Sequence, residues 1–190
     1  MKIKKKHIVI VAIVVVMVLL IIWIAYCNTD LEINKFNVKS SNIPTGFDNF
    51  RIAQVSDLHN SELGENNEKL IAMLKRTDAD IITITGDMID SRNTDVDVAV
   101  SFAEKAVDIA PVYYVNGNHE SRVAKEYEEL KQGLAEAGVT ILENTAVDIS
   151  IGDESITLVG INASLGAEST GGSWFCASSE SGEKKNAAVI

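Results

Sequence analysis

The chain has 190 residues, 17 basic against 27 acidic side chains, and a formal net charge of −10. That length holds one soluble domain plus a targeting segment. The acidic surplus argues against nucleic acid as a partner, because nucleic-acid-binding surfaces are basic. The two cysteines, Cys27 and Cys176, make no disulfide framework.

An apolar segment near the N-terminus predicts a membrane anchor over residues 1–27. Four lysines precede an unbroken apolar run of 20 residues from Ile8 to Cys27, and a helix of about 20 residues crosses the hydrocarbon core. A cleavable signal peptide is the alternative, but its apolar part is usually about 7–15 residues long and ends at an A-x-A site, which is not found after this run. A lipoprotein signal ending at Cys27 is disfavoured by the bulky Tyr26.

The lysines also predict an orientation. Basic residues gather on the cytoplasmic side of membrane spans, so the sequence predicts a single-pass protein of the cell membrane. The remaining residues, 28–190, then lie on the extracytoplasmic side. They carry 13 basic and 27 acidic side chains, so the acidic surplus belongs entirely to this part of the chain.

Residues 28–50 are expected to form a lead-in strand and a turn. Apolar residues alternate with polar ones at Leu31, Ile33, Phe36 and Val38, which predicts a strand. A turn is predicted after it, between residues 40 and 49, because the segment contains proline and glycine.

Strands and helices alternate through residues 51–161. The predicted strands are Arg51–Ser56, Asp80–Thr85, Val112–Val115 and Thr140–Leu142, the predicted helices are Asn67–Arg76, Thr94–Ala110 and Arg122–Ala137, and a hairpin joins Asp148–Ile151 to Ser155–Gly160. This alternation indicates an α/β domain with a mostly parallel sheet covered by helices.

The pattern stops after Ile161. Ten of the 27 residues from Ser164 to Ile190 are serine or glycine, and no helical or strand period continues. Residues 162–190 are therefore expected to be an irregular or disordered tail. Trp174 and Phe175 are unusual in such a stretch.

Three short polar motifs follow three of the predicted strands. Asp57 and His59 follow the first strand, Asp87 follows the second after a glycine, and Asn118 and His119 follow the third. Each motif alone has an ordinary explanation: chance for the D-x-H triplet, turn chemistry for Gly-Asp, and a helix cap with a solvated histidine for Asn-His. Their order and their spacing of about 30 residues favour one shared site.

Together the motifs resemble the signature of the calcineurin-like metallophosphoesterases, which reads D-x-H, G-D and G-N-H-D/E, and the likeness is greatest to membrane-anchored bacterial members. The resemblance covers residues 51–160. It implies part of an αββα sandwich, in which a mostly parallel sheet is flanked by helices. It also implies two divalent metal ions as cofactors. Mixed oxygen and nitrogen donors suit manganese, iron or zinc.

The family's roles carry over by position. Asp57 and His59 would bind the first metal, Asp87 would bridge both metals, and Asn118 would bind the second. His119 would not be a ligand; the resemblance makes it the catalytic residue that faces the leaving-group oxygen.

The chain also departs from the family pattern. The family closes its site with further histidines in its C-terminal half, whereas this chain has three histidines and none follows His119. Asn60 and Glu120 adjoin the motifs and are expected to support the ligands. We expect the C-terminal half of the domain, including its second β-sheet, to be missing.

These observations predict a membrane-anchored, metal-dependent phosphoesterase, a hydrolase that cleaves phosphate esters or pyrophosphates through a two-metal site. Its substrates would be phosphate esters, lipid-linked or nucleotide-linked, because the site lies near a bilayer. The alternative is a catalytically inactive, membrane-tethered fragment that binds a metal or another ligand. A generic α/β binding domain with accidental motifs ranks last.

Overall fold

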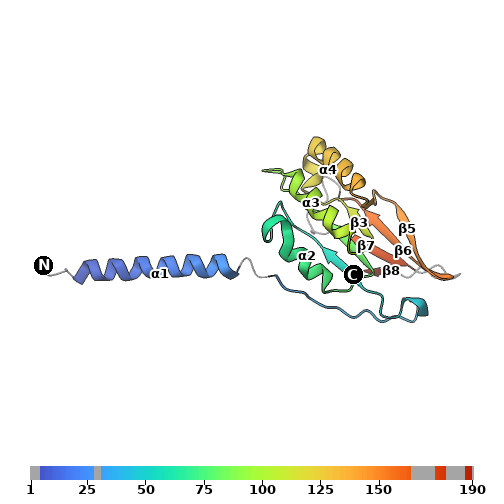
Figure 1. The fold of residues 1–190 in the computed structure, drawn as a ribbon, viewed down its shortest axis with the longest axis horizontal. Helices are drawn as coiled ribbons and strands as arrows, with labels where there is room; N and C mark the ends of the chain where they lie inside the picture. The colour runs from blue at the N-terminus through green and yellow to red at the C-terminus, as the bar shows by residue number, and fades with distance from the viewer. Residues whose placement is uncertain (1–4, 28–30, 164–173, 179–186, 190) are drawn as a thin grey trace. The chain divides into compact units, whose positions relative to one another are not determined.

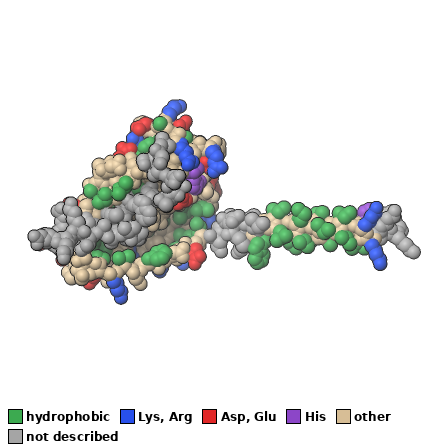
Figure 2. Space-filling model, turned by 180° about the vertical axis from the view of Figure 1, so that it is seen from behind, with side chains coloured by type: hydrophobic (Ala, Val, Ile, Leu, Met, Phe, Trp, Pro, Cys, Tyr) green, Lys and Arg blue, Asp and Glu red, His purple; other side chains and the backbone are tan. Residues whose placement is uncertain are grey.

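The computed structural model describes residues 5–27, 31–163, 174–178 and 187–189, and the chain divides into two compact units, Met1–Lys35 and Phe36–Ile190 (Figure 1). The first unit contains the helix α1, Lys5–Cys27. Apolar side chains from Ile8 to Trp23 are exposed around this helix, with lysine at its N-terminal end (Figure 2). Length and composition make α1 a candidate membrane span, a test that a signal sequence also meets.

The predicted lead-in strand is wrong. Residues 31–40 belong to neither sheet, and the side chains of Phe36 and Val38 are 81% and 47% exposed. The apolar alternation therefore does not pack against a strand neighbour. In the segment where the turn was predicted, residues 41–42 and 48–49 form turns and a short 3-10 helix at Thr45–Phe47 buries Phe47.

The second unit is built on a four-stranded parallel sheet in the order β1-β2-β3-β4. Its strands are β1 (Ile52–Val55), β2 (Ile81–Thr85), β3 (Val112–Val115) and β4 (Thr140–Ile141). Every residue of β2 is buried, as expected for a central strand covered on both faces. The predicted mostly parallel sheet is thus confirmed.

Three helices cover one face of this sheet (Figure 1). They are α2 (Glu68–Lys75), α3 (Val96–Val107) and α4 (Ala124–Glu136), with short 3-10 turns at Glu65–Asn67 and Glu120–Arg122. Ile82 and Ile84 of β2 share a buried core with Phe102 of α3 and Leu130 of α4. Alternate strand residues point to opposite faces, so the neighbouring Ile81 lies in a second core.

That second core lies under another sheet. Strands β5 (Ala146–Ile151), β6 (Glu154–Ile161), β7 (Trp174–Ser178) and β8 (Ala187–Val189) form an antiparallel sheet in that order. Leu158 of β6 packs with Ile81, Val115 and Leu142. The expectation that the second sheet is missing is therefore wrong, and the region expected to be an irregular tail contributes two strands to it.

Candidate metal centre

The three motifs lie on loops that leave the same edge of the parallel sheet. The loop after β1 runs along the loop after β2: the N–H groups of Asp57, His59 and Asn60 donate to the carbonyl oxygens of Gly86, Asp87 and Met88 at 3.2, 2.9 and 2.9 Å. Parallel neighbours end on one side of a sheet, so this pairing continues the register of β1 on β2. The first two motifs are thereby fixed against each other.

Several residues of these loops adopt left-handed backbone conformations. The φ angles of Asp57, His59, Asn60 and Asp87 are 57°, 45°, 58° and 52°. Such angles are uncommon outside glycine, and they cluster at functional sites where the surrounding structure holds them. Here the backbone hydrogen bonds between the loops hold them.

Two glycines allow the second and third motifs to touch. A Cβ at Gly86, whose φ is +83°, would stand 2.3 Å from the backbone nitrogen of Gly117. A Cβ at Gly117 would stand 2.2 Å from Oδ1 of Asp87. Glycine at both positions is therefore a steric requirement of the close approach.

The side chain of Glu120 connects the loop after β2 to the loop after β3. Its side chain is completely buried, and it accepts hydrogen bonds from the backbone N–H groups of Asp87 and Gly117, both at 2.9 Å, and of Met88 and Ile89, at 2.7 and 3.3 Å. Burial raises the pKa of Glu120 above its ordinary value, and the backbone N–H donors oppose that rise. The side chain of Asn60 also holds the loop after β2, because its Oδ1 accepts the N–H of Asp90 at 3.1 Å.

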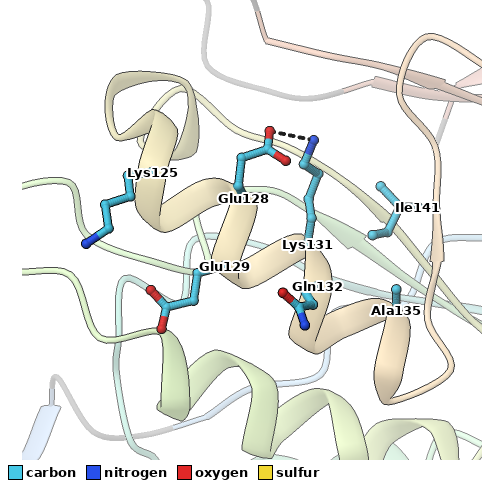
Figure 3. A pocket seen from close by; sticks show the side chains of 7 residues that line it. All are labelled: Lys125, Glu128, Glu129, Lys131, Gln132, Ala135 and Ile141. Carbon is cyan, nitrogen blue, oxygen red and sulfur yellow. Dashed lines mark ion pairs between the residues drawn. The ribbon is translucent and has the colours of Figure 1, made fainter.

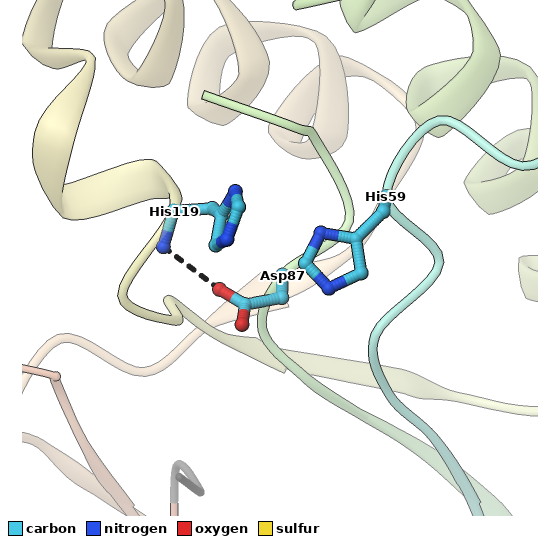
Figure 4. Close-up of side chains that lie close together, drawn as sticks. All are labelled: His59, Asp87 and His119. Atoms are coloured by element: carbon cyan, nitrogen blue, oxygen red, sulfur yellow. Dashed lines mark hydrogen bonds between the residues drawn. The ribbon is translucent and has the colours of Figure 1, made fainter. Parts of the chain in front are cut away.

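Candidate ligand atoms of His59, Asp87 and His119 lie within 4.8 Å of one another (Figure 4). The two imidazole rings meet edge to face with centroids 4.5 Å apart, and Oδ1 of Asp87 accepts the backbone N–H of His119 at 2.8 Å. Nδ1 of His59 is buried and has no hydrogen-bond partner among the described residues. Two imidazoles, a carboxylate and an unpaired ring nitrogen fit a divalent transition metal.

The other two predicted ligands lie at the edges of this cluster. Asp57 is not a member of the group of three; its side chain is 66% exposed, and its Oδ1 lies 3.8 Å from Nε2 of His59. Asn118 is half-buried. Its backbone position is fixed from both sides by Gly117 and His119, whose N–H groups are bound by Glu120 and Asp87.

His119 has two further neighbours that the sequence did not single out. Its Nδ1 accepts the backbone N–H of Ser91 at 3.1 Å and lies 3.5 Å from Oδ1 of Asp90. The N–H of Arg92 donates to Asp90 and holds the pKa of that carboxyl below its ordinary value. The only signal for Asp90 was an acidic residue three positions after Asp87, which is too common to stand out.

The third loop is also attached to the second sheet. Ser121 Oγ donates to the carbonyl oxygen of Ala163 at 2.7 Å, and the N–H of Ala163 donates to Oδ1 of Asn116 at 3.1 Å. The end of β6 is therefore tied to the loop that carries Asn118 and His119.

A shallow surface depression on α4 has no part in this site. It is lined by Lys125, Glu128, Glu129, Lys131, Gln132, Ala135 and Ile141 (Figure 3). Lys131 pairs with Glu128 at 2.8 Å and with Glu143 at 3.1 Å. Its charge is thus already neutralised by neighbouring carboxylates.

Comparison with known proteins agrees with this geometry. The chain is 26% identical over 136 residues to the uncharacterized metallophosphoesterase YkoQ of Bacillus subtilis, an alignment that covers 70% of this chain and 50% of YkoQ. It is 39% identical over 66 residues to the uncharacterized metallophosphoesterase YkuE of the same organism, covering 34% of this chain and 23% of YkuE. The chain thus spans at most about half the length of these curated relatives. Residues 50–168 match the calcineurin-like phosphoesterase family. The protein belongs to that family of metal-dependent hydrolases.

Proposed function

We propose that the protein is a membrane-anchored phosphoesterase that hydrolyses phosphate esters or pyrophosphates with the aid of two divalent ions. The observation that carries the proposal is the convergence of His59, Asp87 and His119, with ligand atoms within 4.8 Å of one another at one edge of the sheet. Family membership supports the reaction class.

The residues divide into metal ligands and a proton donor. Asp57 and His59 would hold one ion, Asp87 would bridge, and Asn118 would hold the second, with manganese, iron or zinc as the candidates. When bound, two such ions lower the pKa of a water molecule and neutralise the charge of the phosphate. Nδ1 of His59 is buried and has no hydrogen-bond partner among the described residues, so this nitrogen gives up no hydrogen bond when it binds a metal.

His119 is suited to handle the leaving group. Because Nδ1 accepts the N–H of Ser91, the neutral ring carries its proton on Nε2, which can donate a hydrogen bond to a leaving oxygen. Transfer of a proton to that oxygen requires the positively charged ring. The carboxylate of Asp90, 3.5 Å from Nδ1, stabilises the ring when it is positively charged. Asp87 fixes the backbone of His119 and Ser91 contacts its ring, so the ring is oriented before substrate binds.

The helix α1 is proposed as the anchor, which makes lipid-linked phosphates accessible substrates. Its lysines predict that the phosphoesterase unit lies outside the cytoplasm. Protease added to spheroplasts should then digest residues 28–190 and spare the N-terminus. Protection of the unit would contradict the predicted orientation, and its release in soluble form after cleavage near residue 27 would contradict the anchor.

Hydrolysis can be tested with the full chain in detergent. With excess Mn²⁺ and bis(p-nitrophenyl) phosphate we expect slow, metal-dependent release of nitrophenol, since among the described residues only His59, Asp87 and His119 bring candidate ligand atoms together. Asp87→Asn should abolish that release. Hydrolysis that persists in Asp87→Asn or without metal would contradict the proposal.

Asp57 lies outside the group of His59, Asp87 and His119 and is 66% exposed, which favours a second candidate, a membrane-tethered module that binds metal without catalysis. The same preparation separates the two functions. Binding of Mn²⁺ with no hydrolysis above the metal-free control supports the binding module, and metal-dependent hydrolysis supports the enzyme.

A further inference from the structure

Glu120 is a buried carboxylate whose partners are backbone amides rather than a cation. Among the described residues no lysine, arginine or histidine side chain pairs with it, and its exposed fraction is 0%. Burying a charge costs several kcal/mol or more unless it is well compensated. An apolar side chain of similar volume would fill this position without that cost, so packing alone does not explain the carboxylate.

The way in which the two carboxylate oxygens share four hydrogen bonds explains why a carboxylate occupies this position. Oε2 accepts the N–H groups of both Asp87 and Gly117 and therefore bridges two loops that are 30 residues apart in the chain. Oε1 accepts the N–H groups of Met88 and Ile89, which fixes the segment directly after Asp87. A carboxylate is the side chain that offers two oxygens with no donor to oppose these four amides.

The bridge closes a ring of contacts around the candidate ligands. Glu120 binds the N–H of Asp87, and the side chain of Asp87 in turn binds the N–H of His119. Asp87 has a φ of 52°, a conformation that persists only where surrounding contacts hold it. Removing the bridge therefore leaves both the strained Asp87 and the Asn118-His119 pair without their common support.

We propose that Glu120 is a positioning residue: its carboxylate holds the Asp87 loop and the Asn118-His119 loop in the register that brings the metal donors together. The inference rests on the proposed function, because it assigns Glu120 a role toward those donors. In this role Glu120 touches neither substrate nor metal and acts only through the two loops.

The test is Glu120→Gln in the full chain, solubilised in detergent, with Glu143→Gln as the matched control. Glutamine keeps the shape but turns one acceptor into an NH₂ donor, so two of the four amides lose their partner. Glu143 also accepts two hydrogen bonds, from Tyr127 and Lys131, but it does not touch these loops. We expect Glu120→Gln to weaken Mn²⁺ binding by about tenfold or more and Glu143→Gln to leave it unchanged.

Hydrogen–deuterium exchange without metal supplies an independent readout. In the wild type the amides of Asp87, Met88 and Gly117 should exchange slowly although they lie outside helices and strands, and in Glu120→Gln they should exchange faster. If the wild type binds no Mn²⁺ while this difference in exchange is observed, the proposed function fails and the positioning role stands. Rapid exchange of these amides in the wild type overturns the inference even if Glu120→Gln does not fold. A folded Glu120→Gln variant whose amides exchange as slowly as in the wild type, and whose Mn²⁺ affinity is unchanged, overturns the inference as well.

Discussion

Gly117 illustrates how closely the second and third motifs approach each other. A methyl group there would lie 2.2 Å from Oδ1 and 2.5 Å from the backbone nitrogen of Asp87, so Gly117→Ala must displace the carboxylate. We expect a loss of about 1–3 kcal/mol of stability, typical of overpacking, together with weaker Mn²⁺ binding. Thermal unfolding and metal titration measure the two effects.

Gly152→Ala is the control for that substitution. Gly152 lies at the turn between β5 and β6 with a φ of +61°, and a methyl group there would meet no atom within 4 Å. Its replacement should affect stability without affecting metal binding. Unchanged Mn²⁺ affinity in Gly117→Ala would show that the close approach does not support the site.

His119 can serve as a proton donor or as a third ligand, and one variant separates these roles. As a proton donor, His119→Ala should lower turnover by about 10²–10⁴-fold while the bound Mn²⁺ stays nearly constant. Steady-state kinetics and metal analysis of the same preparation give both quantities. A parallel loss of metal would assign His119 to the ligand set with His59 and Asp87, as their 4.8 Å cluster permits.

At the scale of elements, the packing of the two sheets depends on a few apolar side chains. Leu158 of β6 is 2% exposed and contacts the core formed with Ile81 and Val115. Leu158→Ala should destabilise the protein by about 2–5 kcal/mol, measured by urea unfolding. Ile161→Ala on the same strand is the control, because Ile161 is 48% exposed and its loss should cost far less. An equal loss of unfolding free energy in Leu158→Ala and Ile161→Ala would show that Leu158 of β6 does not stabilise this core.

The attachment of α4 to the strand edge predicts a response to alkaline pH. Burial, followed by the hydrogen bond to Glu143, raises the pKa of Tyr127 above its ordinary value. Because the unfolded chain ionises tyrosine near about pH 10, the stabilisation is present below that pH and is lost as pH rises toward the higher folded pKa. The free energy of unfolding should fall above about pH 10, and fall less in Tyr127→Phe. Identical pH slopes for the two proteins would contradict this assignment.

Sequence patterns predicted the parallel strands and the three helices to within three residues at each end, because apolar periodicity reflects burial directly. They failed at Leu31–Val38, where alternation occurs without a strand neighbour. They also missed β7 and β8, whose serine- and glycine-rich surroundings hide a strand signal. Long-range pairing, here β7 on β6, is not encoded in any local period.

Candidate site residues could be predicted from the sequence where polar side chains directly follow a predicted strand. Asp57, His59, Asp87, Asn118 and His119 could be named because each follows an apolar run. Asp90 and Ser91 could not, since their contact with His119 depends on how the loop after β2 folds back over the rim. The four amide bonds of Glu120 likewise exist only in the folded chain.

For the whole molecule, the structure describes a candidate span and a phosphoesterase unit with its core between two sheets and three helices. The charge supports this division, since residues 28–190 carry all 27 acidic side chains and the flank before Ile8 carries none. Such an acidic unit would bind an anionic phosphate poorly unless cations neutralised the rim. The proposed function therefore depends above all on the metal site.

Calorimetric titration of Mn²⁺ into the full chain, with the wild type compared to Asp87→Asn, tests that site without relying on a substrate. Asparagine can still accept the N–H of His119 at this position, so the loop should keep its shape while the ligand charge is lost. We expect saturable binding to the wild type and binding weaker by about tenfold or more in Asp87→Asn. Equal Mn²⁺ affinity in the two proteins, or no saturable binding to the wild type, would contradict a metal centre at these residues.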